Sequence, residues 1–344
     1  MPNNGTSIHW HGMRQLNRDT HDGVPGITEC LITPGGSKTY TFQATQHGTS
    51  WYHSHFSSQY GDGIVGPIVI HGPATANYDY DLGPLPITDW YYPAVAVLAS
   101  LALHTNGLPP EADNALINGS MTSSSGAILF LSFLAASHES SQVSGVMYLL
   151  MPANRLEAIG SVLKSKIKLA VVRTSTVETS NRYFPTRAMK QRFLLANQLH
   201  SPTSEYVKSN NTNYPTRANV IELPQEGQWT YWVIQGIAGS PYDVEVPHPI
   251  HLHGHDFYIL GTGQGQYTNA NSGALNYINP TRRDTAILPG GEWLALVFQT
   301  DNPGAWVMHC HIAWHADEGF AVHFLETVSI MQNEDSIGSD FNAQ

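Results

Sequence analysis

The amino-acid sequence predicts an all-β fold, and its composition, strand pattern and turns all favour that class. Only 12% of the 344 residues are charged, whereas glycine and proline contribute 30 and 21 residues. Such a composition is typical of turn-rich β proteins rather than helical ones. Short apolar or alternating segments recur between turn residues, which indicates β-sandwiches or barrels. A chain of this length has room for roughly two to three domains.

The first part of the chain, residues 1–75, contains four predicted strands. They cover residues 6–12, 37–44, 50–56 and 64–71. Two of them carry a His-x-His pair, and residues two apart on a strand share one face. These pairs are His9/His11 and His53/His55.

The middle part, residues 76–192, differs from both ends. As far as residue 120 it is rich in proline and tyrosine, which predicts a linker followed by the opening strands of another β unit. Residues 121–192 then hold nine of the 16 lysines and arginines, and they lack tryptophan. The apolar run at 126–136 is too short to span a bilayer. We interpret residues 121–192 as an atypical insert without a catalytic role.

The C-terminal part, residues 193–344, returns to the strand pattern of the first part. Its polar tail from residue 332 is expected to be frayed. Its predicted strands cover 220–224, 228–236, 248–261, 292–300, 305–315 and 320–330.

The charge balance excludes some classes of partner. The formal net charge of −11 argues against nucleic acid, and the chain has no basic amphipathic stretch for an anionic membrane. N-glycosylation sequons at Asn4, Asn118 and Asn210 are compatible with a secreted glycoprotein. No signal peptide opens the chain. We expect an extracellular monomer.

Histidine is the most unusual feature of the composition, because its 18 residues outnumber lysine and arginine together. A single His-x-His pair is weak evidence, since half-buried strands often carry histidines with ordinary hydrogen bonds. Four such pairs in one chain, with a cysteine between the members of the last, predict a metal site. The pairs are 9/11, 53/55, 251/253 and 309/311, and two further histidines, His248 and His315, stand nearby.

The predicted strand that ends in His309-Cys310-His311 determines how the metals are arranged. Side chains alternate along a strand, and residues two apart lie about 6.5 Å apart on one face. Cys310 should therefore point one way, and His309 and His311 the other. One strand can then contact two metal centres and join them through covalent bonds. A disulfide between Cys310 and Cys30 is the alternative, but a cysteine between two histidines is better used as a thiolate ligand.

The types of ligand favour copper. One thiolate with two imidazoles and a weak axial position is the ligand set of blue copper sites. The remaining eight paired histidines are suited to a multinuclear cluster. Structural zinc prefers closed tetrahedral sets and does not explain both sites.

These motifs carry a family resemblance. HWHG (9–12), WYHSH (51–55), HPIHLHGH (248–255) and HCHIAWH (309–315) resemble the four copper-binding signatures of multicopper oxidases. DGVPGITEC and NALING are similar to segments of ascomycete laccases. The resemblance covers roughly residues 1–120 and 193–330. It implies cupredoxin-like Greek-key β-sandwich domains, four coppers per chain, and phenolic or aromatic reductants with O2 as substrates.

The resemblance also implies a role for each ligand. His248, Cys310 and His315 would hold the type 1 copper, and His9 and His251 the type 2 copper. The type 3 pair would be held by His11, His53, His55, His253, His309 and His311. Electrons from the substrate would pass from the type 1 copper through Cys310 to His309 and His311, and O2 would be reduced to water at the trinuclear cluster.

Two further residues have a predicted role with an ordinary alternative. Phe320 occupies the family's axial position and cannot ligate, which predicts a three-coordinate, high-potential type 1 site; the alternative is core packing. Asp22 matches an acidic position of laccases and would supply protons for oxygen reduction. The Asp22-Gly23 pair is also a common turn.

The chain departs from the family pattern in several places. Residues 1–75 would be a partial first domain that lacks its opening strands, and 76–192 a linker with a degenerate second domain. Residues 193–344 would be a C-terminal domain with the type 1 site and half of the trinuclear site. In the family, the partner of a cysteine such as Cys30 lies near the C-terminus, where this chain has none. The alternatives to a laccase are a related oxidase of ascorbate or metal ions, and a partial copper-binding β protein without activity.

Overall fold

The computed structural model describes residues 5–74, 77, 81, 83–104, 110–121, 178–179, 219–235, 246–317 and 319–327. Within these residues the chain forms four β-sheets and few helices, so the predicted all-β class is confirmed. Among them, no helix has the length and apolar character that a membrane crossing requires.

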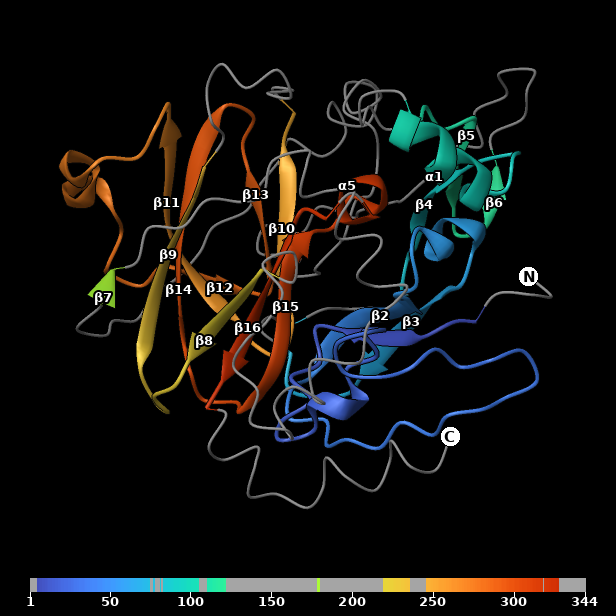
Figure 1. The fold of residues 1–344 in the computed structure, drawn as a ribbon, viewed down its shortest axis with the longest axis horizontal. Helices are drawn as coiled ribbons and strands as arrows, with labels where there is room; N and C mark the ends of the chain where they lie inside the picture. Colours follow the sequence, from blue (N-terminus) through green and yellow to red (C-terminus); the bar gives the residue numbers. More distant parts are fainter. Residues whose placement is uncertain are drawn as a thin grey trace.

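The first part of the chain forms a three-stranded antiparallel sheet with the order β1-β2-β3 (Figure 1). In this sheet His9 lies opposite His53, and His11 lies opposite Trp51. This register brings the two His-x-His pairs to neighbouring strands. The strands are β1 (Ile8–His11), β2 (Gly48–Ser54) and β3 (Val65–Ile70), with 3-10 turns at η1 (Asp19–His21) and η2 (Gln59–Asp62).

One predicted strand of this part was wrong. Residues 37–44 run without ladder hydrogen bonds, because no strand of the described residues lies alongside them. Their side chains make local contacts instead. Lys38 Nζ lies 2.8 Å from Glu29 Oε2, and the Tyr40 hydroxyl donates to Glu29 Oε1 over 2.8 Å.

A second small sheet, with the order β4-β5-β6, lies beside helix α1 (Figure 1). The sequence prediction placed a linker and strands here and missed the helix. Helix α1 packs through Val95 and Ala102 against Trp314. These tertiary contacts stabilise the helix. The elements are β4 (Ile87–Trp90), α1 (Val95–His104), β5 (Asn114–Ile117) and β6 (Ser120–Met121).

The C-terminal part forms a sandwich of two five-stranded sheets, with the orders β13-β10-β15-β16-β8 and β12-β11-β14-β9-β7. Figure 1 shows the two sheets side by side. The strands are β7 (Glu178–Thr179), β8 (Val220–Leu223), β9 (Trp229–Gln235), β10 (His248–Leu252), β11 (Phe257–Gln264), β12 (Thr281–Arg283), β13 (Thr285–Leu288), β14 (Glu292–Gln299), β15 (Gly304–Cys310) and β16 (Ala321–Glu326). A 3-10 segment, η5 (Asn269–Ala274), and helix α5 (Ala313–Asp317) complete it.

Two predicted strands of this part are interrupted. The run 248–261 divides into β10 and β11 at a turn where Gly254 has φ +70°, a backbone conformation that favours glycine. The run 305–315 ends as a strand at Cys310 and continues into α5, which carries His315. Strands β12 and β13 were not predicted.

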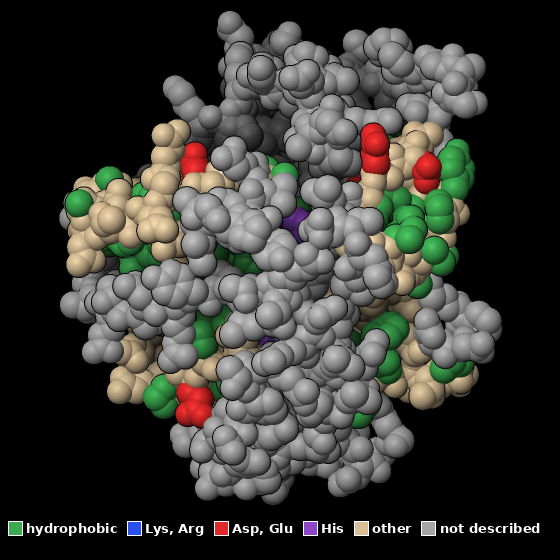
Figure 2. Space-filling view, turned by 45° about the horizontal axis from the view of Figure 1, so that its top comes forward, with side chains coloured by type: hydrophobic (Ala, Val, Ile, Leu, Met, Phe, Trp, Pro, Cys, Tyr) green, Lys and Arg blue, Asp and Glu red, His purple; other side chains and the backbone are tan. Residues whose placement is uncertain are grey.

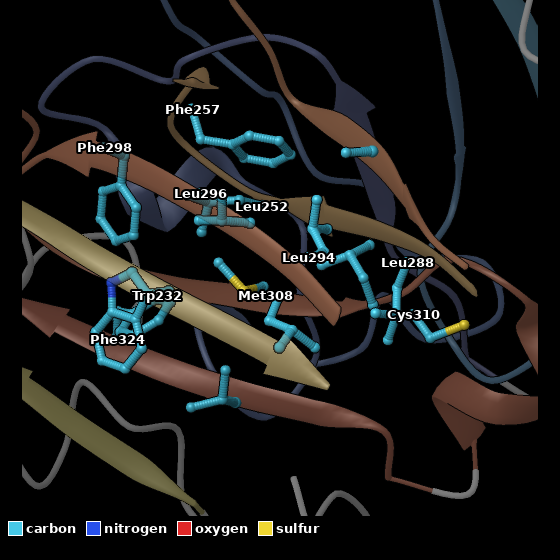
Figure 3. Close-up of a cluster of buried hydrophobic side chains, with 14 of the residues drawn as sticks. Trp232, Leu252, Phe257, Leu288, Leu294, Leu296, Phe298, Met308, Cys310 and Phe324 are labelled. Carbon is cyan, nitrogen blue, oxygen red and sulfur yellow. The ribbon is translucent and has the colours of Figure 1, made fainter. Parts of the chain in front are cut away.

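The hydrophobic core lies between the two sheets of the sandwich. Met308 and Cys310 of β15 both point into it, as Figure 3 shows, whereas the residue between them, His309, does not belong to it. Leu288, Leu294 and Phe324 pack in the same cluster. The alternation predicted for this strand is therefore confirmed, and it directs the thiol and the imidazoles to different sides.

Candidate metal centre

The first candidate site is a group of three residues at one end of the sandwich. Cys310 Sγ lies 3.6 Å from His248 Nδ1 and 3.6 Å from His315 Nδ1, and the two imidazole nitrogens are 3.2 Å apart. The residues come from the end of β15, the start of β10 and helix α5. Cys310 is fully buried, and His248 is half-buried. We call this group the cysteine site.

The second candidate site is a cluster of eight buried or half-buried histidines, which we call the histidine cluster. Four come from the first part of the chain and four from the C-terminal part. Its candidate ligand atoms fall into groups within which all atoms lie within 4.8 Å of one another. These groups are His9/His11/His251, His11/His53/His311 and His55/His253/His309.

Hydrogen bonds to the main chain orient several rings of the histidine cluster. The Nδ1 atoms of His53, His251 and His309 lie 2.9–3.0 Å from the carbonyl oxygens of Ser54, Asp284 and Cys310. A ring that donates its Nδ1–H to a carbonyl keeps Nε2 unprotonated, which is the state a metal ligand needs.

Asp22 lies between the two halves of the histidine cluster. Its Oδ2 is 2.7 Å from His253 Nδ1, and its Oδ1 is 3.2 Å from His9 Nδ1. The residue is fully buried, and burial raises the pKa of its carboxyl group while His9 opposes that rise. Gly23 allows the close approach, because a Cβ there would meet the Ile8 carbonyl group. The structure thus places Asp22 against the cluster, and its catalytic role stays a prediction.

Asp284 is a residue that the sequence reasoning missed. Its Oδ2 lies 3.2 Å from His11 Nε2 and 3.7 Å from His251 Nδ1. It precedes β13, a strand that the pattern did not predict, and one aspartate after two arginines carries no local signal. Only the pairing of β13 with β10, with Thr285 opposite His251, brings it to the cluster.

The electrostatics of the histidine cluster favour neutral rings. Burial lowers the pKa of His309 to about 3, and burial also moves the pKa of His53, His251 and His311 well below the usual value. Neutral imidazole is the form that binds a metal.

Among the described residues, the Nε2 atoms of His53, His55 and His311 are buried and have no hydrogen-bond partner. A buried polar atom without a partner costs folding free energy, whereas metal ions bound to the two groups that contain these rings would satisfy all three. The donor set of this cluster and the thiolate–imidazole set of the cysteine site both fit copper.

The structure thus brings the predicted ligands together in groups of three, and both their binding of copper and their assignment to particular coppers stay predictions. Phe320 lies beside the cysteine site, with its ring centroid 5.1 Å from that of His248. Neither cysteine forms a disulfide, so the alternative of a bridge between Cys310 and Cys30 is wrong.

Comparisons with known proteins agree with this geometry. Sequence profiles of the multicopper oxidase family match residues 1–75 and 183–329. The chain is 39% identical to laccase-3 of Botryotinia fuckeliana, over 94% of this chain and 95% of that protein. The crystal structure of the laccase from Botrytis aclada superposes with a TM-score of 0.73 at 30% identity, over 99% of this chain and 81% of that one. A multicopper oxidase that functions in iron import shares the fold, with a TM-score of 0.69 at 20% identity, over 99% and 84% of the two chains.

The chain therefore belongs to the multicopper oxidase family, and its sandwich is of the cupredoxin-like type found in these structural neighbours. Within the family it is a laccase-type enzyme of the fungal group, with copper as its cofactor.

Proposed function

We propose that the chain oxidises small phenolic or aromatic molecules one electron at a time and reduces O2 to water. Copper, when bound, supplies electron acceptance at the cysteine site and oxygen reduction at the histidine cluster. The single observation that carries this proposal is the arrangement of β15, which contributes to both sites. Two histidines of the cluster are covalent neighbours of Cys310.

The cysteine site is placed to receive electrons from a substrate. His248 is half-buried whereas Cys310 and His315 are buried, so an imidazole edge is the accessible part of the site. Ile287, which lies opposite Pro249 in the neighbouring strand, is 52% exposed and offers an apolar surface nearby. On the face shown in Figure 2, histidine side chains are visible only as small patches, and the described acidic side chains stand apart from them.

The main chain of β15 provides the connection between the sites. His309 and Cys310 share a peptide bond, and so do Cys310 and His311. His309 Nδ1 also lies 2.9 Å from the Cys310 carbonyl oxygen, which adds a hydrogen-bonded contact along the same route. We infer that electrons leave Cys310 through these two neighbours.

The histidine cluster is built to exclude bulk water and to supply protons from fixed groups. Its rings are largely buried, and Asp22 Oδ2 lies 2.7 Å from His253 Nδ1. Burial raises the pKa of the Asp22 carboxyl group and so favours its protonated form, which suits a general acid. We infer that Asp22 orients His9 and His253 and supplies protons to the oxygen that is reduced.

The chain is 39% and 30% identical to two proteins named laccase but only 20% identical to the iron-import oxidase. This difference supports the proposal that the substrates are phenolic molecules rather than metal ions. We also propose that the protein acts outside the cell as a monomer.

The test is a copper count on the purified full chain, combined with optical and EPR spectra and with O2 consumption. Four coppers per chain, a blue absorption band and faster O2 consumption with a phenol than with Fe(II) or ascorbate would support the proposal. A single copper without O2 consumption would instead indicate the partial copper-binding protein. Faster consumption with Fe(II) or ascorbate would indicate the related oxidases.

A further inference from the structure

Asn302 lies in the turn before β15, where the first part of the chain meets the sandwich. It is completely buried, with 0% of its surface exposed. The histidine cluster forms only where these two parts meet, since each supplies four of its rings. A buried polar side chain at this boundary must find hydrogen-bond partners, and the identity of those partners reveals what it holds together.

The side-chain amide of Asn302 binds the main chain of both parts. Its Nδ2 donates to the carbonyl oxygen of Arg14 over 2.7 Å and to that of Gly254 over 2.9 Å. Its Oδ1 accepts the main-chain N–H of Asn17 over 3.0 Å. Two donated bonds and one accepted bond also fix which end of the amide is nitrogen.

The two carbonyl groups belong to the segments that carry cluster ligands. Arg14 is three residues after His11, and Gly254 directly follows His253. One nitrogen atom therefore joins the segment after a ligand of the first sheet to the segment after a ligand of the sandwich. Gly254 has φ +70° and lies against the Trp306 ring, which leaves little freedom for its carbonyl group to turn.

The main chain of Asn302 is anchored in the sandwich. Its N–H donates to Glu326 Oε1 over 2.6 Å, and its carbonyl oxygen accepts Trp306 Nε1–H over 2.7 Å. Glu326 is also completely buried, and its Oε2 lies 2.9 Å from His255 Nε2. Asn302 is therefore held on the sandwich side by β15 and β16, and its amide reaches across the boundary.

We propose that Asn302 is a positioning residue that sets the distance between the two halves of the histidine cluster. This inference rests on the proposed function, because it assumes that the cluster binds copper. The cysteine site does not depend on the residue, since all three of its ligands lie within the sandwich. Loss of the amide should consequently affect the two sites differently.

The boundary offers a matched control in Arg14 and Asp301. Arg14 Nη2 lies 2.5 Å from Asp301 Oδ1, but the aspartate side chain is 44% exposed. Water and salt screen such a pair. Asp301→Asn removes one charge beside Asn302, retains the size of the side chain and leaves every bond of the Asn302 amide in place.

The experiment compares wild type, Asn302→Asp, Asn302→Ala and Asp301→Asn, each as the full copper-loaded chain. Asn302→Asp turns the donor into an acceptor that faces two carbonyl groups, and Asn302→Ala removes the amide without adding charge. Both Asn302 variants should retain the blue band and EPR signal of the type 1 copper and lose the trinuclear coppers and their spectral features. Asp301→Asn should keep the full copper content and wild-type spectra.

Two outcomes would overturn the assignment. Asn302 variants that keep a complete trinuclear cluster would show that the amide is not needed to position it. Variants that lose the type 1 signal together with the others would show a general role in folding of the sandwich. Failure of the proposed function is a separate result, because wild type itself would then lack the trinuclear coppers.

Discussion

The cysteine site and the histidine cluster use the same type of ligand but differ in what assembles them. All ligands of the cysteine site lie between residues 248 and 315 and belong to one sandwich. The histidine cluster takes half of its rings from the first part of the chain, where β1 and β2 belong to a separate sheet and one further ligand directly follows β2. The first site requires one sandwich to fold, whereas the second also requires a second sheet to dock upon it.

A buried contact surface between the first part of the chain and the sandwich holds the first sheet in its docked position. Val24 and Ile27 of the first part form a buried cluster with Ala305, Val307 and Leu325 of the sandwich. Asp22 reaches from the first part to His253, and the Tyr60 hydroxyl donates to the His311 carbonyl oxygen over 3.0 Å. Apolar burial supplies most of the attraction, and the polar contacts fix the register.

Substitution of Cys310 should have the largest effect. Cys310→Ser removes the thiolate, so the type 1 copper and the blue band should disappear and phenol oxidation should stop. The trinuclear histidines are unchanged, and copper analysis with EPR should still detect their metal. Cys30→Ser is the matched control, because Cys30 is exposed and outside both sites. An active, blue Cys310→Ser protein would disprove the assignment.

Substitution of His53 tests the other side of the comparison. His53 belongs to the first sheet, and its Nε2 is a buried atom without a hydrogen-bond partner among the described residues. His53→Ala should lose trinuclear copper and O2 consumption while the blue band persists. His47→Ala, at an exposed position in the same part, should behave as wild type. Loss of the blue band in His53→Ala would show that the two sites do not assemble independently.

Substitution of Asp22 tests the role of its contacts with the two halves of the histidine cluster after copper has bound. Asp22→Asn retains the size of the side chain but cannot serve as a carboxyl proton donor. General acid catalysis typically contributes about 10²–10⁴-fold, so the rate of O2 reduction should fall within that range. Stopped-flow reoxidation of the fully reduced enzyme measures this step directly. Full copper content with an unchanged reoxidation rate would remove Asp22 from the mechanism.

Substitution of Phe320 should have the smallest effect and should be confined to the cysteine site. Phe320→Met offers a thioether at the predicted axial position, which should lower the reduction potential of the type 1 copper. Phe320→Leu is the non-ligating control and should keep a potential near that of wild type. A redox titration of the type 1 copper in wild type and both variants measures these potentials. A wild-type potential as low as that of the Met variant would show that Phe320 serves only as core packing.

Much of the site could be predicted because its ligands lie in short motifs. The alternation along the β15 segment alone separated Cys310 from His309 and His311. The short motifs at residues 9–12 and 51–55 were sufficient to identify the histidines of the first part. Asp284 could not be found in this way, because its closeness to His11 depends on the pairing of β13 with β10.

For the fold, too, local patterns predicted some strands, whereas others depend on tertiary pairing. Strands built on apolar runs, such as β9 and β14, were predicted nearly to the residue. The segment 37–44 alternates more regularly than they do, but ladder hydrogen bonds need a neighbouring strand that its own sequence does not contain. The predicted domain boundaries and the insert at 121–192, of which only residues 121 and 178–179 are described, stay predictions.

The sequence by itself determined the ligand types, their spacing along each strand and the side of β15 to which each points. These properties follow from the two-residue period of an extended chain, which is local. Only the tertiary structure decided that Asp22 and Asp284 contact the ligands and that Asn302 joins the segments that follow two of them. Their contacts join residues far apart in the chain, and such contacts depend on how the first sheet docks on the sandwich rather than on any local pattern.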